Sequence, residues 1–265
     1  MKWTSAREDG GGFPAPAELR SGPMAIVLFT DFGSNDLYVG QVEAVLDRYA
    51  PGVRVIHLLH EAPPFNIRAA AHLLAALVRG LGRGHAYLAV VDPGVGTARA
   101  AVVLRADGSW YVGPDNGLFA VIAARAAATS IWRIRGVPPG ASPSFHGRDI
   151  FAPMAAAVAT DDFPNENVEP TAELAVRAGP DDLAEVIYVD HFGNCFTGIR
   201  AQGASRAGWI RAAGREIPHA RVFAEVPPGA PLWYENSSGL VEIAIDQGHA
   251  ARELGLAVGT AVAWR

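Results

Sequence analysis

Two aspartates stand where a short apolar run gives way to a loop that contains glycine. Asp31 follows the run at 25–30, and Asp92 follows the run at 86–91. In α/β sheets such loops lie outside the carboxyl ends of the strands, where ligands bind. A carboxylate at Asp31 could accept hydrogen bonds from both hydroxyls of a ribose, because its two oxygens match two adjacent donors. The alternative is that Asp31 only caps the helix behind it.

The loop that begins at Asp92 reads Asp-Pro-Gly-Val-Gly-Thr-Ala-Arg and ends at Arg99. Its two glycines allow backbone to approach a ligand closely, and its proline fixes the direction of entry. The lysine and the spacing of a phosphate-binding loop are absent, so no phosphate site is indicated. Taken alone, the pattern favours an ion pair between Asp92 and Arg99 that holds the loop in place.

Three other polar turns carry side chains that could bind a nucleoside or exchange a proton. His146 and Gly147 precede a helical stretch, so the imidazole and the Gly147 N–H could face a bound group. Asn194 can pair with the edge of a base, and Phe192 can stack on it. The third turn is Asn-Ser-Ser-Gly at 236–239. The last two could equally be only tight connections between strands.

Strand and helix patterns alternate through the first part of the chain and would position these loops. Strand-like runs fall at 25–30, 53–59, 86–91 and 131–134, and helical patterns at 35–50, 66–81, 116–127 and 149–160. A hairpin is expected around Asp107-Gly108, between runs at 101–104 and 110–112. The alternation predicts an α/β fold with a mainly parallel or mixed sheet covered on both faces.

The second part of the chain has a different pattern. Residues 161–182 are polar and rich in proline, which indicates a linker. Short strand-like runs separated by turn residues follow at 185–188, 195–199, 209–210, 222–225, 232–234, 241–245 and 260–264. They predict a smaller, all-β, barrel-like domain. The expected division is a disordered extension at 1–23, an α/β domain at 24–160, a linker at 161–182 and a β domain at 183–265.

Composition argues against several classes of protein. The formal net charge is −5, and no run of lysine or arginine faces an aromatic cluster, so nucleic acid is not an expected partner. No apolar run reaches the roughly 18 to 20 residues of a membrane span. Cys195 stands alone, which fits the reducing cytoplasm and favours a small core thiol over a nucleophile.

No metal is expected, because the candidate ligands lack the spacing of a known metal motif. They are Asp31, Asp36, Asp92 and His146.

Several phrases of the sequence, in this order, resemble the S-adenosylmethionine (SAM) hydroxide adenosyltransferase family. They are Thr-Asp-Phe-Gly at 30–33, His60 with Pro63-Pro64, and the segments 91–99, 113–118, 145–153, 190–197 and 236–244. The resemblance covers residues 24–265. The fluorinase and chlorinase, which attack the same carbon of SAM with a halide, are relatives of this family.

The resemblance implies an N-terminal α/β domain, a C-terminal barrel-like domain and a homotrimer with active sites between subunits. It also implies that water splits SAM into adenosine and methionine, so that SAM is the substrate and no cofactor is needed. Asp92, Arg99 and His146 would activate the water. The halide enzymes carry a tyrosine where Asp92 stands, and a carboxylate repels a halide but can accept a hydrogen bond from water. Arg99 should stay charged, so it is not expected to be the base.

The same resemblance assigns contacts to the two ends of the substrate. Asp31 would hold the ribose hydroxyls, and Asn194 would contact the adenine. Asp190 corresponds to a residue on the methionine amino group, and Ser237 to one on the methionine carboxylate. Ser238 departs from the halide enzymes, which place an arginine there.

Further positions would line the reaction pocket. Gly147 stands where the fluorinase has a serine that helps to hold fluoride, and Phe65 stands where a tryptophan lines its pocket. Both differences argue against fluorination. Phe145 and Phe192 complete the expected substrate-binding set.

Two alternatives to hydrolysis stay open on the sequence alone. A chloride adenosyltransferase would use the same fold and the same substrate. A non-catalytic module that binds adenosine or SAM would keep Asp31, Phe192 and Asn194 but would not need the triad. Turnover of SAM separates the three possibilities.

Overall fold

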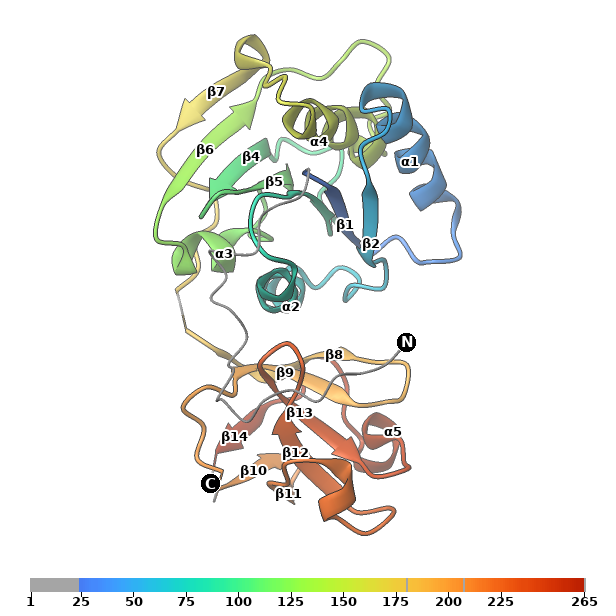
Figure 1. Ribbon diagram of the computed structural model, residues 1–265, viewed down its shortest axis with the longest axis vertical. Coiled ribbons are helices and arrows are strands. Elements are labelled where there is room, and N and C mark those ends of the chain that lie inside the picture. The colour runs from blue at the N-terminus through green and yellow to red at the C-terminus, as the bar shows by residue number, and fades with distance from the viewer. Residues whose placement is uncertain (1–23, 180, 207, 265) are drawn as a thin grey trace, which may run out of the picture.

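The computed structural model describes residues 24–179, 181–206 and 208–264 (Figure 1). The expected disordered extension at 1–23 lies outside the described residues. Within the described part, seven strands form one sheet in the order β2-β1-β3-β5-β4-β6-β7. These strands are β1 (Ile26–Thr30), β2 (Val55–Leu59), β3 (Ala86–Val90), β4 (Ala101–Ala106), β5 (Ser109–Pro114), β6 (Thr129–Ile134) and β7 (Val168–Thr171). The first four in this order run parallel and the others pair antiparallel, which confirms the predicted mixed sheet.

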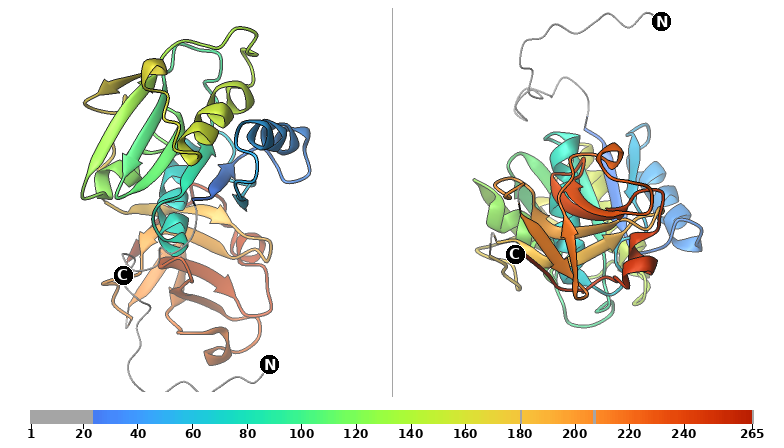
Figure 2. Two further views of the ribbon diagram at one scale, coloured as in Figure 1. Left: turned by 45° about the horizontal axis from the view of Figure 1, so that its top comes forward. Right: turned by 90° about the horizontal axis from the view of Figure 1, so that it is seen from below.

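Helices cover both faces of this sheet (Figure 1). They are α1 (Leu37–Tyr49), α2 (Ile67–Leu77), α3 (Ala120–Arg125) and α4 (Ala152–Ala159). The central strand β1 is buried on both sides, as parallel strands between helices usually are. Ile26 and Leu28 share a core with α1 and α4, whereas Val27 and Phe29 share one with α2 and α3. α2 lies between the sheet and the strands of the second half of the chain (Figures 1 and 2).

The described part of the second half forms two small antiparallel sheets, with orders β12-β13-β9-β8 and β11-β10-β14. Their strands are β8 (Leu183–Val189), β9 (Cys195–Arg200), β10 (Trp209–Ala212), β11 (Arg215–Pro218), β12 (Pro231–Glu235), β13 (Leu240–Ile245) and β14 (Val262–Trp264). Bridges from Glu185 to Ala261 and from His219 to Trp233 join the edges of the two sheets. The strands therefore close around the buried Trp233, which confirms the predicted all-β, barrel-like part.

Some local predictions were right. The turn at Asp107 and Gly108 has positive φ at both residues, 47° and 86°, and joins β4 to β5 in the predicted hairpin. The helix predicted at 35–50 is α1, which begins at Leu37 and is capped by the side chain of Asp36. None of the helices in the described residues is long and apolar enough to cross a membrane.

Other local predictions were wrong. The predicted strand at 222–225 is a 3-10 turn, Phe223–Glu225, because the Glu225 carboxylate accepts a hydrogen bond from the Arg221 N–H and closes the backbone. The helix predicted at 149–160 is present as α4, but its first turn, Gly147–Phe151, is a wide π-helical turn and not α-helix. Pro153 follows that turn and has no N–H to donate to the residue four positions earlier.

Three elements escaped the sequence patterns. They are β7, β11 and a short helix α5 (Ala250–Leu254). β7 lies within the polar segment 161–182 that was expected to be a linker, and it adds an edge strand beside β6. An edge strand needs only one partner, so the polar composition of this segment does not prevent pairing.

Candidate functional site

The neighbouring parallel strands β1 and β3 end side by side and bring two aspartates together. Thr30 pairs with Val90 in the sheet, and the Asp31 N–H donates to the Val90 carbonyl at 3.2 Å. Asp92 follows two residues later. Burial raises the pKa of Asp31, and the negative charge of Asp92 adds to the rise. The two carboxylates therefore belong to one site, at the strand ends where the sequence predicts it.

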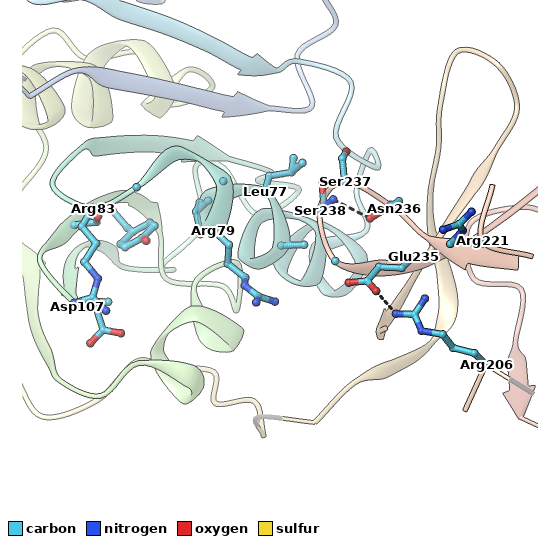
Figure 3. Close-up of a pocket in the computed structure, with 18 residues that line it drawn as sticks. Leu77, Arg79, Arg83, Asp107, Arg206, Arg221, Glu235, Asn236, Ser237 and Ser238 are labelled. Carbon is cyan, nitrogen blue, oxygen red and sulfur yellow. Dashed lines mark hydrogen bonds and ion pairs between the residues drawn. The ribbon is translucent and has the colours of Figure 1, made fainter. Parts of the chain in front are cut away.

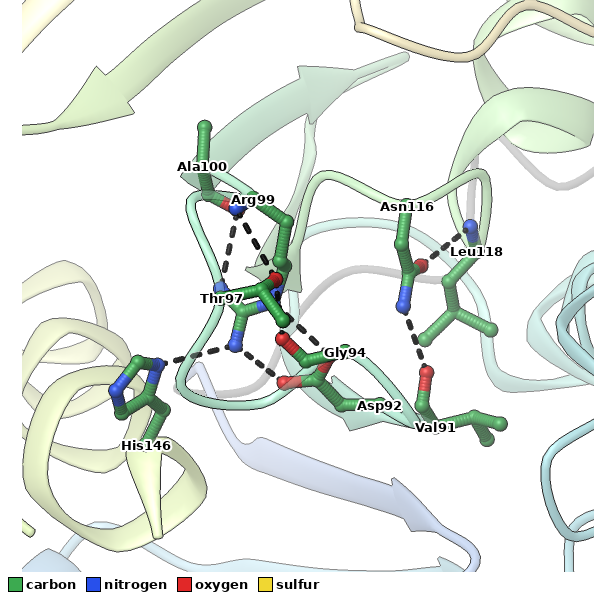
Figure 4. Close-up of polar contacts among 9 residues, drawn as sticks. All are labelled: Val91, Asp92, Gly94, Thr97, Arg99, Ala100, Asn116, Leu118 and His146. Carbon is green, nitrogen blue, oxygen red and sulfur yellow. Dashed lines mark hydrogen bonds and ion pairs between the residues drawn. The ribbon is translucent and has the colours of Figure 1, made fainter. Parts of the chain in front are cut away.

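Asp92, Arg99 and His146 form one connected cluster (Figure 4). Arg99 donates from Nε to one Asp92 oxygen at 2.9 Å and from Nη2 to the other. The same Nη2 lies 3.1 Å from His146 Nδ1. Only 10% of the Arg99 side chain and 5% of the Asp92 side chain are exposed. The ion pair foreseen from position alone is present, and the imidazole extends it.

The loop between Asp92 and Arg99 is held by its own backbone and by the loop before His146. The Val95 N–H donates to the Asp92 carbonyl at 3.2 Å, and the Thr97 hydroxyl donates to the Gly94 carbonyl at 2.7 Å. Gly96 has φ of 79°, and a Cβ there would lie 2.8 Å from the carbonyl oxygen of Pro143. Glycine is therefore required where the two loops meet.

The arrangement of donors fixes the protonation state of His146. A guanidinium can only donate, so His146 Nδ1 must accept, and the proton of the neutral ring lies on Nε2. Burial lowers the pKa of His146, and the positive charge of Arg99 lowers it further. At neutral pH the ring is uncharged, with Nε2–H as a donor.

A cavity of about 370 Å³ adjoins the cluster. Predicted site residues that line it are Asp31, Phe65, Asp92, Phe145, His146 and Gly147. Phe32 and Tyr38 also line it, and their rings pack against Phe145 with centroids 5.8 and 5.3 Å away. These two aromatics were not predicted as site residues, although Phe32 stands inside the Thr-Asp-Phe-Gly phrase. A Cβ on Gly147 would lie 3.0 Å from the Phe32 ring. Because Gly147 has no side chain, the ring can pack directly against its backbone.

Phe65 lies at the open rim of the same cavity. Its side chain is 78% exposed, and its backbone has φ of 61°, which a bulky residue rarely adopts. Its N–H points toward an Asp31 oxygen at 3.5 Å. The turn before α2 therefore presents a bare aromatic ring beside the ribose-binding candidate.

The β8–β9 turn carries Asp190, Phe192 and Asn194, and none of them lines this cavity. Asp190 accepts hydrogen bonds from the backbone N–H groups of Phe192 and Asn194 at 3.0 and 2.8 Å. It also accepts from the Asn194 side chain at 3.2 Å, which orients that amide. The Phe192 ring is 72% exposed. The turn is rigid and displays an aromatic ring to the outside.

Ser237 and Ser238 occupy the β12–β13 turn and line a different cavity of about 830 Å³, together with Arg79 from the 3-10 turn Val78–Leu81 that follows α2 (Figure 3). The pairing of β9 with β13 puts this turn at the opposite end of the sheet from Asn194. Within one chain, the structure therefore does not bring either C-terminal turn to the triad, and it keeps the Asn194 turn apart from the Ser237 turn.

Two other sequence expectations bear on the chemistry. Cys195 is fully buried in the core of the second half, and burial raises its pKa to about 12, so the thiol is a core group as expected. Among the residues that the structure describes, no group of three or more His, Cys, Asp or Glu is placed to hold a metal ion.

Comparisons with known proteins bear on the whole chain. Residues 26–168 match the family model described as SAM hydroxide adenosyltransferase N-terminal domain, and residues 184–263 match its C-terminal domain. The (R)-S-adenosyl-L-methionine hydrolase of Thermus thermophilus is 42% identical over 89% of this chain and 98% of its own length. A fluorinase of Actinopolyspora mzabensis is 24% identical over 89% of this chain and 95% of its own.

A solved structure has the same fold. It is an uncharacterized conserved protein of Thermotoga maritima, and it superposes with a TM-score of 0.82 at 31% identity, covering 90% of this chain and 99% of that protein. The fold predicted from sequence therefore has a close experimental counterpart.

Proposed function

The chain belongs to the SAM hydroxide adenosyltransferase family, and we propose from this premise that it hydrolyses SAM to adenosine and L-methionine. The observation that carries the proposal is the buried cluster of Asp92, Arg99 and His146 beside a cavity that also holds Asp31. A hydrolase at 42% identity supports the same reaction.

Water is the nucleophile in this proposal. It attacks C5′ of SAM opposite the sulfur, the C5′–O bond forms, and the C5′–S bond breaks with its electron pair left on the methionine thioether. The thioether leaves neutral, so no acid is needed. One water proton passes to the Asp92 carboxylate and then to solvent. A weak base suffices because the oxygen becomes strongly acidic as its bond to carbon forms.

The three side chains have different parts in this step. Asp92 accepts the hydrogen bond of the water, because both other members of the cluster are donors on their free sides. His146 offers Nε2–H, since its Nδ1 is occupied by Arg99. Arg99 orients the Asp92 carboxylate by donating hydrogen bonds to both of its oxygens. The carboxylate would repel a halide, which supports water over chloride or fluoride.

We further propose that the working enzyme is a homotrimer whose sites lie between subunits. The N-terminal residues around the triad and the C-terminal turns with Asn194 and Ser237 are separated within one chain, and the rings of Phe65 and Phe192 are exposed. A neighbouring copy could place its Phe192 turn over the cavity at Phe65. Large exposed aromatic rings of this kind are typical of contact surfaces.

In that assembly the substrate contacts fall to both subunits. Asp31 holds the ribose hydroxyls from one subunit, and Asn194 holds the adenine from the next. Ser237 and Ser238 lie toward the methionine carboxylate, whereas Asp190, assigned to the methionine amino group, accepts a hydrogen bond from the Asn194 side chain and so lies beside the adenine contact. The opposite positions of the Asn194 and Ser237 turns on β9 and β13 suit a ligand with an adenine at one end and an amino acid at the other.

Hydrolysis in water enriched in oxygen-18 tests the reaction directly. Purified protein is incubated with SAM, with and without chloride or fluoride, and the products are analysed by chromatography and mass spectrometry. We expect one labelled oxygen in adenosine and none in methionine, in amounts independent of halide. A halogenated nucleoside would identify a halide adenosyltransferase, and bound but unchanged SAM would identify a non-catalytic module.

A further inference from the structure

A chain of hydrogen-bonded side chains runs inward from the surface to the strand that carries Asp31. Glu43 of α1 lies 3.0 Å from Nε2 of His57, and Nδ1 of His57 lies 2.7 Å from Nε2 of His60. Nδ1 of His60 then lies 2.8 Å from the Thr30 hydroxyl. Glu43 and His57 are about half exposed, whereas His60 and Thr30 are buried.

The order of donors along this chain is fixed from its outer end. An ionised Glu43 can only accept, so His57 Nε2 carries a proton and its Nδ1 accepts. His60 must then donate from Nε2 and accept at Nδ1, which leaves the Thr30 hydroxyl as donor. Burial lowers the pKa of His60, and the neighbouring His57 lowers it further, against the opposing charges of Glu43 and Glu61. The His60 ring is therefore neutral near neutral pH.

Thr30, at the inner end of this row of hydrogen bonds, holds the turn that contains Asp31. With its own proton directed at His60, the Thr30 oxygen is free to accept from the Phe32 N–H, 3.4 Å away. The His60 carbonyl accepts from the Gly33 N–H at 2.8 Å, and the Thr30 carbonyl accepts from the Ala62 N–H at 3.0 Å. His60 thus supports the turn on both sides of Asp31.

We propose that His60 is a positioning residue for ribose binding, which acts through Thr30 to fix the direction of the Asp31 carboxylate. The proposal rests on the assignment of Asp31 to the ribose hydroxyls. His60 touches neither the cavity nor the triad, so its effect is on substrate selection rather than on the attack by water.

Calorimetric binding of adenosine and of 2′-deoxyadenosine measures the effect without turnover. A hydroxyl on a charged acceptor contributes more than about 10-fold in affinity, so the wild type should prefer adenosine by that factor. We expect His60→Gln and Thr30→Val to lose most of this preference, and Thr30→Ser, which keeps the hydroxyl, to retain it.

The control is His72→Gln, which changes a histidine of similar burial on α2, outside this chain of contacts. It should keep the preference for adenosine whatever it does to the melting temperature. An unchanged preference in both His60→Gln and Thr30→Val would overturn the proposal while leaving the assignment of Asp31 intact. A wild type without any preference would overturn that assignment and the role of His60 with it.

Discussion

Arg99 donates to Nδ1 of His146 at 3.1 Å while the same guanidinium holds both carboxylate oxygens of Asp92. One cation therefore orients two neighbours at once. Burial lowers the pKa of the imidazole, and the charge of Arg99 lowers it further. A base and an uncharged donor side by side suit the capture of water.

Asp92→Ala should reduce adenosine release by about 100- to 10,000-fold, because the water loses its proton acceptor. Adenosine and SAM should still bind, since Asp31 and the distant turns are untouched. Chromatography gives the turnover and calorimetry gives the binding. Asp92→Asn serves as the matched variant, because it keeps the shape but removes the charge. Full turnover in either variant would disprove the role of Asp92.

Arg99→Ala should lower the free energy of unfolding by about 3 kcal/mol, because it leaves the buried Asp92 carboxylate without its partner. Chemical denaturation measures the change. The control is Arg206→Ala, which breaks an ion pair with Glu235 whose side chains are 53% and 39% exposed. An exposed pair of this kind contributes less than about 1 kcal/mol. Equal losses in the two variants would contradict the importance of burial at Arg99.

Activity and stability should both fall on the acid side because of His146. Its pKa in the folded protein lies below its unfolded value of about 6.5. The unfolded chain therefore binds this proton at a higher pH than the folded protein does. The contribution of His146 to stability is complete above about pH 6.5 and is lost as the pH falls from there through the pKa of the folded state. Protonation of His146 also places an N–H at Nδ1, where it faces the donating Nη2 of Arg99. A pH series of turnover and melting temperature, compared with His146→Gln, checks this. A pH profile of turnover unaffected by the substitution would exclude His146.

Gly96→Ala should disturb the site from outside it. The new Cβ would lie 2.8 Å from the Pro143 carbonyl, and the backbone φ of 79° is unfavourable for alanine. We expect a loss of about 1–3 kcal/mol in stability, and a fall in turnover as the Arg99 and His146 loops separate. Gly94→Ala is the control for stability, because its Cβ would make only ordinary contacts, the nearest at 3.5 Å. A fully stable and active Gly96→Ala would show that the two loops are not coupled there.

The architecture followed from the sequence wherever burial imposed a clear pattern. The run at 25–30 is apolar throughout because β1 is covered on both faces, and a strand with one face in water would alternate instead. The strand prediction at 222–225 was wrong because Phe223 packs against Tyr234 from a turn that the Glu225 carboxylate closes. A side chain that hydrogen-bonds to nearby backbone produces no periodic pattern of apolar residues in the sequence.

The candidate site was predictable only in part for a related reason. Asp31 and Asp92 could be placed together because both end neighbouring strands. The contact of Arg99 with His146 spans 47 residues and depends on how two loops meet at Gly96, which spacing does not encode. The row of hydrogen bonds from Glu43 to Thr30 could likewise not be predicted from the sequence, because its side chains come from three elements. The separation of Asn194 from Ser237 became apparent only from the strand register.

Mixed assemblies should reveal whether each site is built by two subunits. Asp92→Ala removes an N-terminal component, and Asn194→Ala removes a C-terminal one. Each variant alone should be almost inactive. When they are coexpressed with different tags and purified as mixed trimers, some sites combine the intact Asp92 of one chain with the intact Asn194 of another.

Every mixed trimer, whichever variant is in excess, has one site of its three that combines an intact Asp92 with an intact Asn194 of the neighbouring chain, so about one third of the shared sites are intact. We therefore expect purified mixed trimers to recover about a third of the wild-type turnover, and light scattering to give three times the mass of one chain. Sites confined to a single chain would recover nothing, because every chain in the mixture carries one of the two substitutions. The recovered activity thus distinguishes a shared site from a self-contained one even if both variants fold and assemble normally.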